Sequence, residues 1–168
     1  MHTLMFFRNS VVVLFIVFLS ACKSEPGYQA LYDKYYEPYE VQLRQNAEVS
    51  YPMLDTAYQA YLSEDFETVD RLTTKFLDEY FSVPQVMFAQ TIAFVELGKD
   101  EAAISNFKTL AMHPFLGARA KWYRGLVHLR RGELADARQL FEELYNRTYE
   151  IEKTWAESVL KDLEKMES

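Results

Sequence analysis

Apolar residues recur at helical spacing over most of the chain after residue 50. Within two segments they stand three or four positions apart, which places them on one face of an α-helix. The pattern contains no convincing strand, so we expect an all-α fold. The residues are Ala103, Phe107 and Leu110 in the earlier segment, and Leu134, Ala137, Leu140, Phe141 and Leu144 in the later one.

The helical pattern repeats at one fixed interval, which separates Gly98 from Gly132, Ala103 from Ala137, Phe107 from Phe141, and Leu110 from Leu144. A constant period of about 34 residues is typical of arrays of similar helix pairs. Glycine adopts positive φ readily and ends helices, so Gly98 and Gly132 predict a turn inside each pair. Asp100 is a candidate N-cap for the helix that follows the first of these turns.

These positions resemble the tetratricopeptide repeat (TPR), a helix–turn–helix unit of about 34 residues. The resemblance implies a TPR-like solenoid of helical hairpins, with three units at 50–83, 84–117 and 118–151 and a capping helix at 152–168. The first unit is the weakest match, because Thr73 stands where the other units carry Phe107 and Phe141. The position of the turn between the two helices of each unit is occupied by Glu64, Gly98 and Gly132. The position for a small residue in the first helix is occupied by Ala57, Thr91 and Gly125, and the one in the second helix by Val69, Ala103 and Ala137.

The start of the chain has the features of an export signal. Arg8 precedes an uninterrupted apolar run at residues 11–19, which is short for a membrane span of about 20 residues. The run ends in Leu19-Ser20-Ala21-Cys22, which resembles the lipobox of bacterial lipoproteins. That resemblance implies a signal peptide at 1–21 and a lipid on the thiol of Cys22. A simple membrane anchor, or an ordinary signal peptide with a chance cysteine, stays as an alternative.

Lipid attachment at Cys22 implies a place in the cell envelope. Lys23 follows the lipidated position and favours the outer membrane, with the protein facing the periplasm. Residues 22–49 then comprise the lipidated cysteine, a tether and a tyrosine-rich segment. Tyr28, Leu31, Tyr32, Tyr35 and Tyr36 have helical spacing there, and Pro38 is expected to end the helix.

In TPR solenoids the first helix of each pair lines a concave groove. The division into three repeat units places apolar and charged residues in that groove. This composition suits an amphipathic helix or an extended peptide. Two alternatives stay open: the aromatic positions belong to the core, or the tyrosine-rich residues 28–39 fill the groove in cis. The candidate groove residues are Leu54, Phe88 and Trp122 in one column, Tyr58, Ile92 and Leu126 in the next, and Glu96, Arg119 and Arg130 at the edges.

Charge and motif content narrow the function further. The chain carries 18 Lys and Arg against 25 Asp and Glu, a net charge of −7, which disfavours a nucleic-acid partner. The sequence has no Gly-rich phosphate loop and no nucleophile elbow. His113 and His128 have no acidic or histidine partner at metal-ligand spacing, so we expect no metal and no cofactor.

We therefore expect a lipid-anchored, periplasm-facing adaptor that binds a peptide or helix of another envelope protein and is not an enzyme. The alternative is a structural lipoprotein that binds no peptide because residues 28–39 occupy its groove.

Overall fold

A computed structural model describes residues 26–39, 51–80, 83–147 and 151–167. These residues form eight helices and no strand, so the predicted all-α class is confirmed for this part of the chain. The predicted signal peptide, the lipobox and Lys23 lie outside the described residues. The helices are α1 (Pro26–Tyr35), α2 (Pro52–Leu62), α3 (Phe66–Glu79), α4 (Pro84–Glu96), α5 (Asp100–Leu110), α6 (Gly117–Arg130), α7 (Leu134–Arg147) and α8 (Ile151–Glu167).

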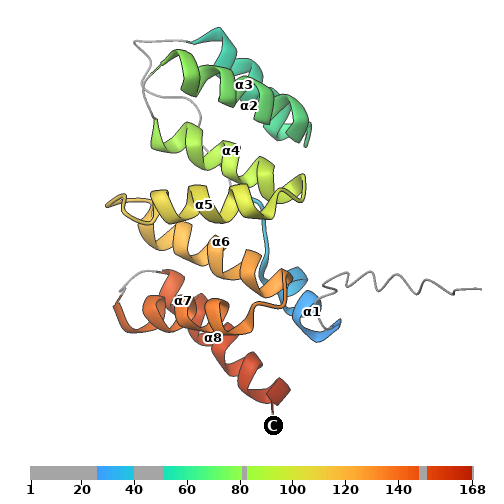
Figure 1. Ribbon diagram of the computed structural model, residues 1–168, viewed down its shortest axis with the longest axis vertical. Coiled ribbons are helices and arrows are strands. Elements are labelled where there is room, and N and C mark those ends of the chain that lie inside the picture. Colours follow the sequence, from blue (N-terminus) through green and yellow to red (C-terminus); the bar gives the residue numbers. More distant parts are fainter. Residues whose placement is uncertain (1–25, 40–50, 81–82, 148–150, 168) are drawn as a thin grey trace, which may run out of the picture.

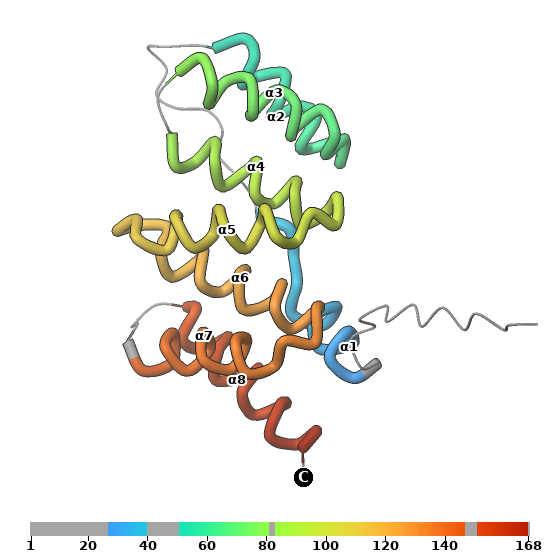
Figure 2. The backbone as a smooth tube through the Cα atoms, viewed as in Figure 1, coloured from blue at the N-terminus to red at the C-terminus, as the bar shows by residue number. Residues whose placement is uncertain are grey.

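From α2 to α8, each helix packs on the next one along the chain, which produces a single stacked column (Figure 1). The α2–α3 pair lies at one end of the column and the α7–α8 pair at the other. By contrast, α1 packs on α6 and α8, which are distant in sequence (Figure 2). Of the helices described, none is long and apolar enough to cross a bilayer.

The turns inside the three helix pairs share one backbone geometry. Glu64, Gly98 and Gly132 have φ values of 59°, 68° and 74°, and they recur at one constant interval along the chain. The residue after each turn donates its N–H to the carbonyl five residues back, as in Glu133 to His128 at 2.9 Å. The positive-φ residue itself donates its N–H to the carbonyl three residues back. These two hydrogen bonds together form the Schellman arrangement that ends helices. The turn positions predicted from the sequence are therefore confirmed.

Glu64 carries a side chain in a backbone conformation that glycine adopts more cheaply. A non-glycine residue in the left-handed region costs roughly 1–2 kcal/mol, partly offset by the greater flexibility of glycine in the unfolded chain. We expect Glu64→Gly to raise the free energy of unfolding by about 0.5–1 kcal/mol, measured by urea unfolding. The reciprocal change Gly98→Ala, where an added Cβ would meet no atom within 4 Å, should lower it by about 1 kcal/mol. Equal stability of both variants with the parent chain would contradict this.

Small residues allow the paired helices to approach each other closely. Gly125 in α6 faces Phe141 in α7, and a Cβ placed on Gly125 would lie 2.7 Å from Cε1 of that ring. The predicted small-residue positions are all buried: Ala57, Thr91 and Gly125 in the first helices, and Val69, Ala103 and Ala137 in the second. Thr73, which departs from the pattern, is also buried and donates its hydroxyl to the carbonyl of Val69 at 2.6 Å.

Candidate functional site

Residues 28–39, here called the N-terminal segment, lie across one face of the column. Their partners come from α2, α4, α6 and α8, the first helix of each pair and the last helix. We call the surface of these four helices that the segment contacts the first-helix face. The segment begins beside α8, runs past α6 and ends against α4 and α2 (Figures 1 and 2).

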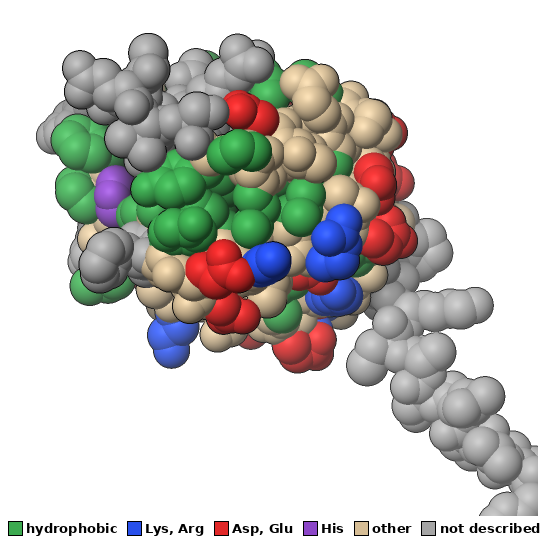
Figure 3. All heavy atoms as spheres, turned by 90° about the horizontal axis from the view of Figure 1, so that it is seen from above, with side chains coloured by type: hydrophobic (Ala, Val, Ile, Leu, Met, Phe, Trp, Pro, Cys, Tyr) green, Lys and Arg blue, Asp and Glu red, His purple; other side chains and the backbone are tan. Residues whose placement is uncertain are grey.

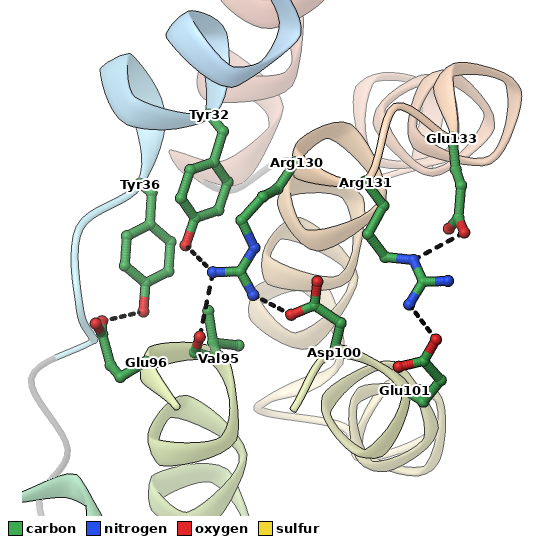
Figure 4. A network of polar contacts seen from close by, with 9 residues as sticks. All are labelled: Tyr32, Tyr36, Val95, Glu96, Asp100, Glu101, Arg130, Arg131 and Glu133. Atoms are coloured by element: carbon green, nitrogen blue, oxygen red, sulfur yellow. Dashed lines mark hydrogen bonds and ion pairs between the residues drawn. The ribbon is translucent and has the colours of Figure 1, made fainter. Parts of the chain in front are cut away.

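The helical half of the segment is held by an arginine at the end of α6 (Figure 4). Arg130 donates from Nη1 to the hydroxyl of Tyr32 at 3.2 Å and to the carbonyl of Val95 at 3.1 Å. Its other terminal nitrogen pairs with Asp100, and its Cζ lies 4.9 Å from the centre of the Tyr32 ring. Asp100 is the first residue of α5, and the N-cap position falls on Lys99. The prediction that Asp100 is an N-cap is therefore wrong by one position.

Tyr36 extends this network toward α4. Its ring stacks on Tyr32 with the centroids 4.8 Å apart, and its hydroxyl donates to Glu96 at 2.5 Å (Figure 4). Two of the three charged residues predicted at the groove edges, Glu96 and Arg130, thus bind tyrosines of this chain's own N-terminal segment.

The extended half of the segment uses both its backbone and its rings. Tyr39 packs on Phe88 with a centroid distance of 4.9 Å, and its carbonyl accepts from the hydroxyl of Tyr61 at 2.5 Å. Two residues earlier, the carbonyl of Glu37 accepts from the hydroxyl of Tyr123 at 2.6 Å. Buried tyrosines of α2 and α6 therefore satisfy backbone acceptors of the segment, as they would for a bound peptide.

A carboxylate of α8 fixes the middle of the segment. Asp162 accepts from Lys34 at 2.6 Å and from the hydroxyl of Tyr35 at 2.7 Å. Hydrogen bonds from Lys165, Lys34 and Tyr35 hold the pKa of Asp162 below its ordinary range. The ring of Tyr35 meets Trp122 edge to face, with the centroids 6.3 Å apart.

The predicted groove residues separate into two groups. Four of them touch the N-terminal segment directly: Phe88, Glu96, Trp122 and Arg130, with Arg119 as a fifth through its stacking on Tyr39. Ile92 and Leu126 have no exposed surface and Leu54 very little, so these three are core residues. Tyr58, in α2, is half-buried.

A cavity of about 620 Å³ lies where the N-terminal segment meets α6 and α8. Arg119 lines it, with its guanidinium carbon 5.0 Å from the ring centre of Tyr39 and 4.9 Å from that of Trp155. Nε of Arg119 donates to Glu152 at 2.5 Å, and Glu152 is buried. We call this the Arg119 cavity.

Sequence reasoning missed several residues that hold the segment. Tyr61, Tyr123 and Asp162 contact it directly, Glu152 positions Arg119 beside it, and each of these contacts joins distant parts of the chain. Trp155 lies in the range predicted as a capping helix, 152–168, and forms a wall of the Arg119 cavity. Only their positions on first helices and on the capping helix could have indicated this role.

The expectation that His128 lacks an acidic partner is wrong. Nδ1 of His128 lies 2.6 Å from an oxygen of Glu133, and Asp136 is near enough for one ligand atom of each residue to lie within 4.8 Å of the others. The turn at Gly132 folds Glu133 back over the end of α6. Glu133 is also engaged by Arg131 at 2.8 Å, so ion pairing accounts for the cluster.

Burial of tyrosines at the first-helix face predicts a loss of stability in alkali. Burial raises the pKa of five tyrosines above the ordinary value of 10.0, so the folded chain keeps protons that the unfolded chain loses: Tyr32, Tyr35, Tyr36, Tyr61 and Tyr123. The stability is complete below pH 10 and falls above it, by up to roughly 7 kcal/mol per pH unit for five tyrosines. The tyrosinate absorbance that belongs to these five residues should rise only as helical circular dichroism is lost. Tyr61→Phe should reduce the slope by about one fifth, whereas ionisation of all the tyrosines before unfolding would contradict the prediction.

Another exposed apolar surface lies away from the N-terminal segment. Viewed from the α2–α3 end of the column, hydrophobic side chains gather near the middle of the surface, with charged side chains around part of the rim (Figure 3). Leu62 at the end of α2 and Tyr80 just after α3 are exposed, and so are Met112 and Phe115 in the α5–α6 loop.

No protein-family model, no curated protein and no solved structure matches this chain.

Proposed function

We propose that this protein is a membrane-anchored adaptor that binds a segment of another envelope protein, and that its own N-terminal segment occupies the binding face until that partner displaces it. The observation that carries the proposal is the position of residues 28–39 across α2, α4, α6 and α8. A short helix followed by an extended stretch is held there by ring contacts and by backbone hydrogen bonds. These are the means by which proteins recognise peptides.

The adaptor would be built from three TPR-like helix pairs and a capping helix. The support is the shared turn geometry at Glu64, Gly98 and Gly132, which recurs at a constant interval, together with the buried small residues where paired helices cross. Tandem pairs of this kind expose a continuous face that is used for protein binding.

The anchor would be a lipid on Cys22, as the lipobox implies. Cys22 precedes the first residue of α1, Pro26, by four residues, which span at most about 14 Å. The start of α1 would therefore stay near the membrane surface, which Lys23 suggests is the periplasmic side of the outer membrane. Gly27 lies beside Met166 at the end of α8, so that end of the column would face the membrane, and the apolar α2–α3 end would point away from it.

The partner should present the chemistry of residues 28–39. We expect tyrosines or other aromatic residues on one face of a short helix, then an aromatic residue in extended conformation. Such a sequence would reproduce the cation–π contact that Tyr32 makes with Arg130 and the packing of Tyr39 on Phe88. Aromatic residues and arginine also contribute most to the binding energy of interfaces.

One observation favours the structural alternative. Leu31 and Tyr32 are only 7% exposed, which is the burial of core residues. In that alternative the N-terminal segment is a permanent part of the fold and binds no competitor.

Photocrosslinking separates the two roles. A photoreactive phenylalanine in place of the exposed Glu96 should, in cell envelopes, give one main adduct with another protein, and its yield should rise several-fold in a chain that also carries Tyr32→Ala. The matched control places the same group at Lys75, exposed on α3 outside the first-helix face. Adducts confined to the chain's own residues 28–39 in both backgrounds would contradict the adaptor role and favour the structural alternative.

A further inference from the structure

The Arg119 cavity has the size of a ligand site. Its volume of about 620 Å³ lies within the usual range for pockets that bury small ligands. The rings of Tyr39, Trp122 and Trp155 form part of its walls. The charged groups on its lining are Arg119, Lys34 and Glu37.

Arg119 is a fixed cation with terminal donors that no described residue uses. Its guanidinium is held between Tyr39 and Trp155, and Nε is taken by Glu152. Its two terminal nitrogens donate to no residue in the part of the chain that the structure describes. A planar guanidinium with free terminal N–H groups matches a carboxylate, which it can bind through two parallel hydrogen bonds.

The charges around the cavity limit the negative charge that a ligand can carry there. Glu152 balances Arg119, and Asp162 balances Lys34. Glu37 on the wall would repel a dianion such as phosphate more strongly than a single carboxylate. The aromatic walls add a preference for a flat or apolar body next to that carboxylate.

We propose that the Arg119 cavity binds a carboxylate carried by an aromatic or large apolar group, with Arg119 holding the carboxylate and Tyr39, Trp122 and Trp155 enclosing the apolar group. The C-terminal residue of a polypeptide and a free aromatic acid both offer this chemistry. Because Tyr39 and Lys34 belong to the N-terminal segment, a ligand here joins the segment to α6 and α8. It stabilises the occupied first-helix face, whereas the adaptor's partner displaces the segment.

The test is a titration of the full chain in detergent micelles, followed by the fluorescence of Trp122 and Trp155. The probe is the tripeptide Gly-Gly-Phe with a free carboxylate, and its controls are the same peptide with an amidated end and Gly-Gly-Gly. We expect a saturable change with the probe and at least tenfold weaker binding of both controls. A titration with 3-phenylpropionate distinguishes the two sources of the ligand. If it binds as tightly as the tripeptide, the ligand is a free aromatic acid, and if it binds tenfold more weakly, the ligand is the C-terminal end of a polypeptide.

Variants locate the site. Arg119→Lys keeps a positive charge beside Glu152 but loses the two-donor edge, and we expect at least tenfold weaker binding of the tripeptide. The matched control Arg131→Lys, at the end of the same helix and outside the cavity, should bind as the parent does. If Arg119→Lys fails to fold, Lys34→Gln at the exposed rim should weaken binding about threefold through the lost charge.

Three results would overturn the proposal: no saturable change up to about 10 mM probe, equal affinity for the amidated peptide, or unchanged affinity in Arg119→Lys. The titration uses a chain whose N-terminal segment is in place. A chain that never releases this segment, and so fails as an adaptor, would still bind the tripeptide.

Discussion

Replacing Tyr32 by alanine is expected to lower the free energy of unfolding by about 3–4 kcal/mol. Tyr32 is 7% exposed, stacks on Tyr36 and lies under the guanidinium of Arg130. The change removes a buried ring and takes a cation–π partner and a hydrogen-bond acceptor from Arg130. Urea unfolding followed by circular dichroism measures the effect.

The control is Tyr32→Phe, which keeps the ring and removes only the hydroxyl. It should cost about 1 kcal/mol, the usual value of one hydrogen bond. If Tyr32→Ala also costs no more than about 1 kcal/mol, the N-terminal segment does not contribute a packed ring to the fold. The same result would remove the reason to regard residues 28–39 as an occupant of the first-helix face.

Phe141→Ala is expected to cost about 3–5 kcal/mol, because this ring has no exposed surface and fills the space between α6 and α7. It contacts the ring of Trp122, with the centroids 5.4 Å apart, and it covers Gly125. Phe115→Ala, at a ring that is 88% exposed, is the matched control and should change stability by less than about 0.5 kcal/mol.

Gly125 provides a second test of the same contact. Gly125→Ala brings a Cβ to within 2.7 Å of the Phe141 ring, which we expect to cost about 1–2 kcal/mol despite the better helix propensity of alanine. In a Phe141→Leu background the clash is relieved, and the same change should be neutral or stabilising. Additive effects of the two substitutions would show that these residues do not meet.

Local features of the fold could be predicted well from the sequence. Glycine at 98 and 132 marks turns because only the backbone conformation of a few neighbouring residues is involved. Glu64 could be placed in the same role through the repeat period, although its side chain gives no such signal, and its φ of 59° agrees. The small residues Ala103 and Ala137 followed from the same period and are fully buried.

The packing of the N-terminal segment could not be predicted to the same degree. The spacing of its tyrosines indicates a helix, but nothing in a single sequence indicates which distant surface the rings meet. Asp162 lies 128 residues from Lys34, and Tyr123 lies 86 residues from Glu37. The sequence therefore leaves two alternatives open: residues 28–39 fill the groove of their own chain, or the groove is open.

The predicted groove residues illustrate a further limit. Helical periodicity separates buried positions from exposed ones, but it does not separate the core between paired helices from a face that binds a ligand. Ile92 and Leu126 are separated by the repeat interval, as groove residues should be, yet both are wholly buried. The charged positions Glu96 and Arg130 were better guides, because a charge near an apolar face needs polar or aromatic partners. Glu96 accepts from Tyr36 of the N-terminal segment, and Arg130, which pairs with Asp100, also contacts Tyr32.

The central claim is that residues 28–39 occupy the first-helix face of their own chain. Nuclear Overhauser effects between aromatic protons of the full-length protein in micelles test it most directly. We predict cross-peaks between the rings of Tyr39 and Phe88, whose centroids are 4.9 Å apart, and weaker ones between Tyr35 and the indole of Trp122 at 6.3 Å. Random-coil shifts for Tyr35 and Tyr39, without either cross-peak, would contradict the claim.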